Sequence, residues 1–78
     1  MKTLATIKPG ETGLITQITA PNSLRQRLYD LGLTPGTKIE LIKFAPLGDP
    51  LEITLRGYKL TLRKNEAVFV LLEESDHA

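Results

Sequence analysis

The 78-residue chain contains no cysteine and no tryptophan, and it has a single histidine. Without cysteine, neither a disulfide framework nor a thiolate metal site can stabilise the fold. Secreted domains of this size usually depend on disulfides, so this absence favours an intracellular, cytoplasmic protein. A chain of this length forms one domain with a thin core, which buries roughly 60% of the surface that the unfolded chain exposes.

Long apolar runs and a large excess of one charge are also missing. No segment approaches the length of a membrane-spanning helix, and the residues after Met1 do not have the pattern of a signal peptide. The net charge is only +1, whereas nucleic-acid modules usually carry a basic excess that neutralises phosphates. We therefore expect any link to a membrane to go through a partner, and we expect no nucleic-acid partner.

The sequence supplies few groups for catalysis. His77 lies one residue from the end, where no serine and acid can be assembled around it on a rigid element. Glu40, Glu52 and Glu66 fall at positions expected to face solvent, where a carboxylate is a poor general acid at neutral pH. The acidic stretch 73–77 could gather a divalent ion, but a flexible tail does not preorganise ligands. We predict no enzymatic activity, no cofactor and no metal site.

Frequent glycine and proline divide the chain into short segments, which favours strands joined by tight turns. Apolar alternation predicts strands at 3–7, 13–18, 37–44, 51–56, 58–63 and 67–72. The alternation shifts its phase after Leu41, which indicates a bulge, and Gly57 predicts a tight hairpin. The expected fold is mainly β, a small and partly open barrel of about five strands.

The pattern also assigns an inner face to several of these strands, including Leu51, Ile53 and Leu55 in the strand 51–56. The face of the strand 13–18 consists of Leu14, Thr16 and Ile18, and that of the strand 58–63 consists of Tyr58, Leu60 and Leu62. Lys64–Glu66 is expected to form a short turn. The terminal strand 67–72 is apolar on both faces, and as an edge it would permit weak self-association.

The segment 22–32 breaks the alternation and predicts one inserted helix. Its buried stripe has helical spacing and consists of Leu24, Leu28 and Leu31. Asn22 or Ser23 is expected to cap the helix, and Gly32 to end it in the left-handed conformation. Pro35 and Gly36 then predict a turn.

The loop 45–50, Ala-Pro-Leu-Gly-Asp-Pro, is the binding feature that the residues support best. Its two prolines limit its freedom, so binding would cost it little entropy, and Leu47 is expected at an exposed tip. The helix offers a second surface. The predicted partner-binding residues are Arg25, Arg27, Tyr29, Pro46, Leu47, Gly48, Asp49 and Pro50. The alternative is an ordinary connection, because single exposed apolar residues are common.

RNA binding by a small SH3-like barrel is the main alternative function. Gly10 and Gly13 have the Gly-x-x-Gly spacing of some RNA-binding barrels. The basic residues that could line one face are Arg56, Lys59, Arg63 and Lys64. However, proteins that read single strands stack bases on exposed aromatic rings. This chain has two tyrosines and two phenylalanines, and most of them lie at expected core positions.

Three motifs occur in a characteristic order: RLYDLGLTPG at 27–36, APLGDP at 45–50 and LRKNEA at 62–67. In this order and spacing they resemble the FeoA family, the small proteins of bacterial ferrous-iron uptake. The resemblance runs from about Lys8 to Glu73. It implies one SH3-like domain over 1–74, with 75–78 as a flexible tail.

The resemblance also implies a function. Members of this family are accessory proteins in the cytoplasm, which dock on a FeoB-type membrane iron transporter that carries a GTP-binding domain. The same fold occurs as the C-terminal domain of some iron-dependent repressors. Because this chain has no DNA-binding or metal-sensing segment, we expect the stand-alone form, with a protein as its partner.

Overall fold

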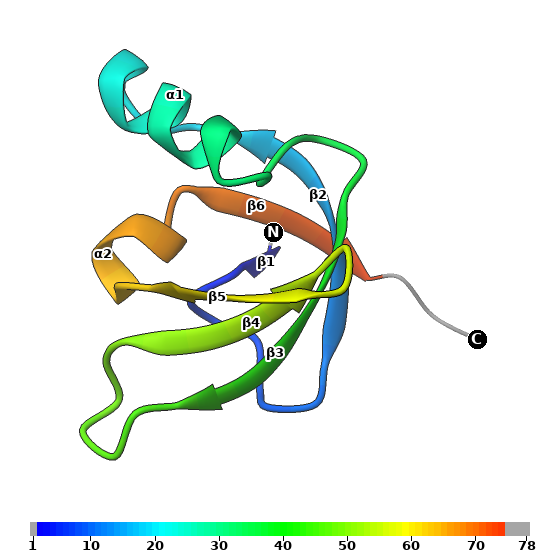
Figure 1. The fold of residues 1–78 in the computed structure, drawn as a ribbon, viewed down its shortest axis with the longest axis vertical. Coiled ribbons are helices and arrows are strands. Elements are labelled where there is room, and N and C mark those ends of the chain that lie inside the picture. Colours follow the sequence, from blue (N-terminus) through cyan, green and yellow to red (C-terminus); the bar gives the residue numbers. More distant parts are fainter. Residues whose placement is uncertain (1, 75–78) are drawn as a thin grey trace.

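Short strands joined by tight turns build the molecule, as the sequence predicts (Figure 1). The structure is a computed structural model that describes residues 2–74. Within these residues it has six strands and two helices: β1 Lys2–Thr3, β2 Thr12–Ile18, α1 Asn22–Asp30, β3 Lys38–Phe44, β4 Leu51–Leu55, β5 Tyr58–Leu62, α2 Lys64–Ala67 and β6 Val70–Glu74. All neighbouring strands are antiparallel, in the order β1-β6-β2-β3-β4-β5. The fold is mainly β, as predicted.

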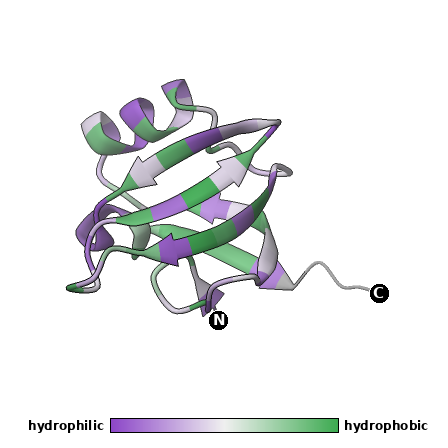
Figure 2. Ribbon diagram, turned by 60° about the horizontal axis from the view of Figure 1, so that its bottom comes forward, coloured by the Kyte–Doolittle hydropathy of each residue, from purple (hydrophilic) through white to green (hydrophobic). Residues whose placement is uncertain are grey.

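The curled sheet surrounds a core to which nearly every element contributes. Each strand except β1 buries apolar side chains there, together with Leu28 of α1 and Leu33 behind the helix. Figure 2 shows hydrophobic residues alternating with hydrophilic ones along the strands, the pattern of a sheet with one covered face. Leu24 and Leu31 of the predicted stripe are half-buried and also pack against the core.

The inner face of β2 differs from the prediction. Ile15 and Ile18 are buried, whereas Thr16 is exposed and Leu14 only half-buried. The reason is a register shift against β6 between Ile15 and Gln17, which inserts an extra residue and changes the phase of the strand. In β3 the predicted bulge is confirmed, since its register against β4 shifts after Leu41.

Two predicted strands begin and end elsewhere. The expected strand 3–7 is only the two residues of β1, because the Thr6 hydroxyl donates to the Thr3 carbonyl over 2.9 Å and closes a turn. The expected turn 64–66 is the helix α2, which also includes Ala67, so β6 starts at Val70. β6 lies between β1 and β2, so it is not the free edge that the sequence suggested.

The hairpin between β4 and β5 has the predicted glycine but a longer turn. Arg56 and Gly57 both have positive φ, of 51° and 86°, which is typical of a two-residue type I′ turn. Arg56 therefore leaves the strand, and its Nη2 donates to the Thr37 hydroxyl over 3.0 Å. Tyr58 follows the turn and is 43% exposed, so the prediction that it points inward was wrong.

The start of α1 also departs from the prediction. Pro21 occupies the N-cap position, and no side chain caps the first turn. Asn22 is already helical, and its side-chain oxygen accepts a hydrogen bond from the Arg25 guanidinium instead. The sequence pattern could not separate these alternatives, because a proline and a capping residue both favour the beginning of a helix.

The end of α1 is confirmed at Gly32. This residue has φ of +100°, its N–H donates to the Tyr29 carbonyl over 2.9 Å, and the Leu33 N–H donates to the Leu28 carbonyl over 3.0 Å. These two bonds form a Schellman motif. The Tyr58 hydroxyl donates to the Leu31 carbonyl over 2.6 Å. A Cβ on Gly32 would clash with that hydroxyl, so the hairpin covers the end of the helix closely.

Gly32→Ala should therefore destabilise the protein more than Gly36→Ala. Both glycines have similar positive φ, but the space around Gly36 is open. We expect Gly36→Ala to lower the free energy of unfolding by about 1 kcal/mol, because of the left-handed conformation alone. At Gly32 we expect about 2–3 kcal/mol, or roughly 10–20 °C in Tm, because the Tyr58 hydrogen bond is lost as well.

Thermal unfolding of both variants, in the wild type and in a Tyr58→Phe background, measures this difference. Without the tyrosine hydroxyl, the two alanine substitutions should cost about the same. Equal losses in the wild-type background would show that the hydroxyl does not fix this end of the helix.

Candidate functional site

The β3–β4 loop, residues 45–50, presents one apolar side chain on a fixed backbone. The Ala45 N–H donates to the Pro50 carbonyl over 2.8 Å and closes the base of the loop. The Gly48 N–H donates to the Ala45 carbonyl over 2.7 Å and closes its turn. Leu47 stands at the tip and is 97% exposed. The predicted exposure of Leu47 is confirmed, while its role as a partner-binding residue stays a prediction.

The first turn of α2 fastens this loop to the rest of the molecule. The Lys64 backbone N–H donates to Oδ1 of Asp49 over 2.9 Å. The Lys64 ammonium lies 5.5 Å from the centre of the Phe44 ring, within the range of a cation–π contact. Asp49 was predicted to contact a partner, but its carboxylate already serves to position the loop.

Glu66 of α2 connects this helix to α1, the second surface that the sequence predicts. Its Oε1 accepts a hydrogen bond from the Arg63 N–H over 3.1 Å, and its Oε2 pairs with the Arg27 guanidinium. The Glu66 side chain is only 14% exposed, so the prediction that it faces solvent was wrong. Burial raises the pKa of Glu66, but the Arg63 N–H and the Arg27 guanidinium lower it more, so the pKa lies below 4.5.

We call the resulting surface the docking face: Arg27 of α1, the helix α2 and the loop 45–50. Figure 1 shows α2, this loop and the start of α1 on the left of the view, whereas the turn of the β4–β5 hairpin lies on the right, where it meets the end of α1. The structure thus brings together the loop and Arg27, which lie far apart in the sequence. Arg25 contacts Asn22 of its own helix, and Tyr29 is half-buried against the core.

Sequence reasoning missed α2 as the element that joins the two surfaces. A signal for it was present, because Glu66 lies three residues after Arg63, the spacing at which an acidic side chain accepts from the N-cap N–H. Three glycines were predicted to have structural roles. Gly32 and Gly57 hold positive φ, and the Gly36 N–H donates to the Ile15 carbonyl over 2.7 Å beside Pro35.

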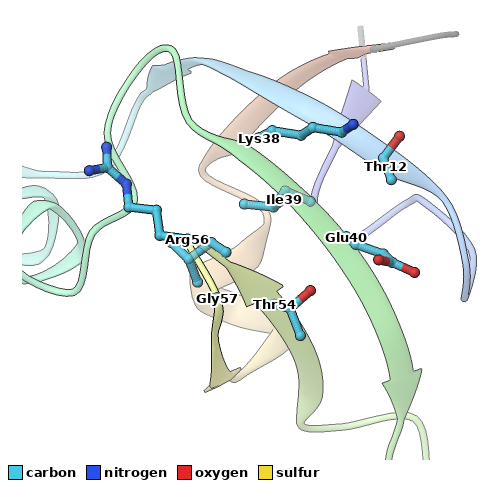
Figure 3. A pocket seen from close by; sticks show the side chains of 8 residues that line it. Thr12, Lys38, Ile39, Glu40, Thr54, Arg56 and Gly57 are labelled. Carbon is cyan, nitrogen blue, oxygen red and sulfur yellow. The ribbon is translucent and has the colours of Figure 1, made fainter. Parts of the chain in front are cut away.

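A hollow of about 310 Å³ lies at the end of the sheet away from the docking face (Figure 3). It is lined by Thr12, Lys38, Ile39, Glu40, Thr54, Leu55, Arg56 and Gly57. The Arg56 guanidinium points away from Lys38 and Glu40, toward the segment 34–37. The hollow therefore gathers one lysine and one glutamate, which is a weak basis for recognition.

The basic residues of the RNA alternative are spread over the molecule. Arg56 binds Thr37 at the hairpin, and Lys59 pairs with Glu52 over 3.5 Å. Arg63 and Lys64 lie at the other end of β5. Of the aromatic rings described, Tyr58 is the exposed one, and its hydroxyl is bound to the backbone. These residues do not form one basic face with stacking platforms.

Neither helix in the described part of the chain has the length and apolarity to cross a bilayer. Within the same part, no three acidic or histidine side chains gather into a group that could hold a metal ion. Most of the acidic stretch 73–77 lies outside the described residues.

Comparisons with known proteins give a consistent result. A model of the FeoA domain family matches residues 2–74. The Fe(2+) transport protein A/Fe(2+) transporter FeoB fusion protein of Porphyromonas gingivalis is 26% identical over 70 residues, or 90% of this chain. This chain spans only 8% of the length of that fusion protein.

Solved structures agree with the fold. The FeoA protein from Chlorobium tepidum superposes with a TM-score of 0.87 at 40% identity, over 94% of this chain and 70% of that one. The FeoA of Stenotrophomonas maltophilia complexed with zinc, a prokaryotic SH3 domain protein, gives a TM-score of 0.81 at 22% identity, over 94% and 91% of the two chains. The latter likeness concerns the fold alone, and it confirms the predicted SH3-like fold.

Glu66→Gln should reduce stability in a manner that depends on pH. The carboxylate has a lowered pKa in the folded state, so its contribution is complete above pH 4.5 and is lost as the pH falls through that lowered pKa. We expect the wild type to melt above Glu66→Gln near neutral pH, and the difference to disappear at low pH.

Glu40→Gln is the matched control, since Glu40 is exposed and forms no ion pair among residues 2–74. Melting curves of the three proteins at about pH 7 and about pH 3 decide the question. A difference for Glu66→Gln that is the same at both pH values would contradict the role of its charge.

Proposed function

This chain belongs to the FeoA domain family, and we propose that it is a cytoplasmic, non-enzymatic accessory that docks on a FeoB-type Fe(2+) transporter. In the relative from Porphyromonas gingivalis, the transport protein A and FeoB parts belong to one chain. Fusion gives two domains a high effective concentration at each other's surface. Where the two are separate chains, a surface with affinity of its own must replace the covalent link.

The observation that carries the proposal is Leu47, 97% exposed on a loop that hydrogen bonds hold in place. A preorganised loop loses little conformational entropy when it binds. Burying a leucine side chain contributes about 1.5–3 kcal/mol, which corresponds to roughly 10- to 100-fold in Kd. Leu47 is therefore the side chain whose burial would contribute most to docking.

Titration calorimetry of the chain into the purified transporter, with and without a GTP analogue, tests the proposal. We expect saturable binding with a Kd on the order of micromolar. Leu47→Asp should weaken it by about tenfold or more, because an aspartate cannot be buried without a partner. Any dependence on the nucleotide would connect docking with the GTP-binding domain.

Pro9→Asp is the matched control, since it also places an aspartate at an exposed turn position, between Lys8 and Glu11. It should bind as the wild type does. Absence of binding by the wild type in every nucleotide state would overturn the proposed function. Equal binding by both variants would show that Leu47 is not in the interface.

A further inference from the structure

We propose that the docking face recognises an extended acidic segment of its partner, in which one carboxylate and one apolar side chain lie two residues apart. The inference rests on the proposed function and adds to it the chemistry of the segment that binds. It follows from two neighbouring hollows in the surface beneath the loop 45–50.

Each hollow has a volume of about 210 Å³, and the two share Pro50 and Thr61 as a common wall. The first is lined also by Arg27, Leu62, Arg63 and Glu66. The second is lined also by Lys43, Ala45, Leu51 and Glu52. Because Pro50 closes the loop and Thr61 belongs to β5, both hollows are built on fixed backbone.

The first hollow has a positive charge that its own lining residues do not neutralise. Arg27 pairs with the carboxylate of Glu66, and Arg63, whose charge also lowers the pKa of Glu66, lines the same hollow. Two arginines and one glutamate in this lining leave a net charge of about +1. Because a carboxylate forms strong charge-assisted hydrogen bonds with positive side chains, this hollow is suited to one acidic side chain.

The second hollow is mainly apolar. Ala45, Pro50 and Leu51 supply its walls, and Glu52 at its rim is paired with Lys59. Lys43, the remaining charged residue, forms no ion pair among residues 2–74 and adds positive charge at this end too. An apolar side chain is therefore the suitable occupant, with Leu47 exposed close by on the loop.

The dimensions favour an extended segment. Taken as a sphere, each hollow is about 7 Å across, which is close to the ~7 Å between side chains i and i+2 on one side of a strand. β5 is an edge strand of the sheet, so Thr61 lies where an added extended chain can run past it.

A protein carboxylate fits this surface better than a nucleic acid does. Glu66, Glu52 and Asp49 lie in or beside the hollows, and they would repel a chain with a phosphate at every nucleotide more strongly than a segment with one carboxylate. The exposed aromatic ring of Tyr58 lies at the other end of β5, so bases have no stacking platform here.

The test uses the full chain and the purified transporter. Arg63→Gln removes the charge of an exposed side chain, and it should weaken binding by about tenfold, while Arg63→Lys should stay within about threefold. Lys38→Gln removes an exposed charge at the 310 Å³ hollow, away from the docking face, and should not change binding. If Leu47→Asp weakens binding but Arg63→Gln does not, docking is retained and the acidic recognition is wrong.

A second measurement on the isolated chain is independent of the transporter. Capped pentapeptides Gly-Leu-Gly-Asp-Gly, and the same peptide with Asn or Lys in place of Asp, are titrated while backbone amide signals are followed by NMR. We expect the Asp peptide to shift the signals of Thr61, Arg63 and Glu66 at about millimolar concentration, and to bind about fivefold tighter than the Asn peptide.

Equal shifts with the Asp and Lys peptides, or no shifts at these amides, would overturn the inference even if the transporter binds. If a hexauridylate shifts the same amide signals more strongly than the Asp peptide does, the occupant of this surface is RNA and not a protein segment. If the transporter does not bind but the Asp peptide does, the proposed function fails and the acidic recognition stands.

Discussion

The Glu66 carboxylate joins segments of the chain that the sheet alone would leave independent. It accepts a hydrogen bond from the Arg63 N–H at the start of α2 and pairs with Arg27 of α1. A second carboxylate, Asp49, accepts from the Lys64 N–H and brings in the loop 45–50. Both acids bind backbone N–H groups at the beginning of a four-residue helix, which therefore fixes the geometry of the whole docking face.

This arrangement suits a domain whose core is thin. The curled sheet and the inner side of α1 use the apolar residues for folding, so the surface must be shaped by polar contacts. The ion pair of Arg27 with Glu66 connects α1 to α2, and Arg63 adds a second positive charge to the hollow beside it. Leu47, in contrast, contributes nothing visible to the core and is available for binding.

Much of the fold could be predicted from the sequence, because its signals are local. The stripe of leucines and Gly32 predict the helix and its end, and the phase shift after Leu41 predicts the bulge in β3. In β2 the residues Leu14, Thr16 and Ile18 alternate without a break, so the bulge that buries Ile15 leaves no mark in the pattern. That bulge depends on the register with β6, which is a tertiary contact.

The same distinction applies to the candidate site. The loop 45–50 was predictable from its prolines, whereas the position of Arg27 beside it depends on Glu66, 39 residues away in the sequence.

Photocrosslinking in membranes that contain the transporter tests the docking face most directly. A benzophenone amino acid in place of Leu47 should crosslink to the transporter, and one in place of Pro9 should not. Crosslinking from position 9 and none from position 47 would contradict the account.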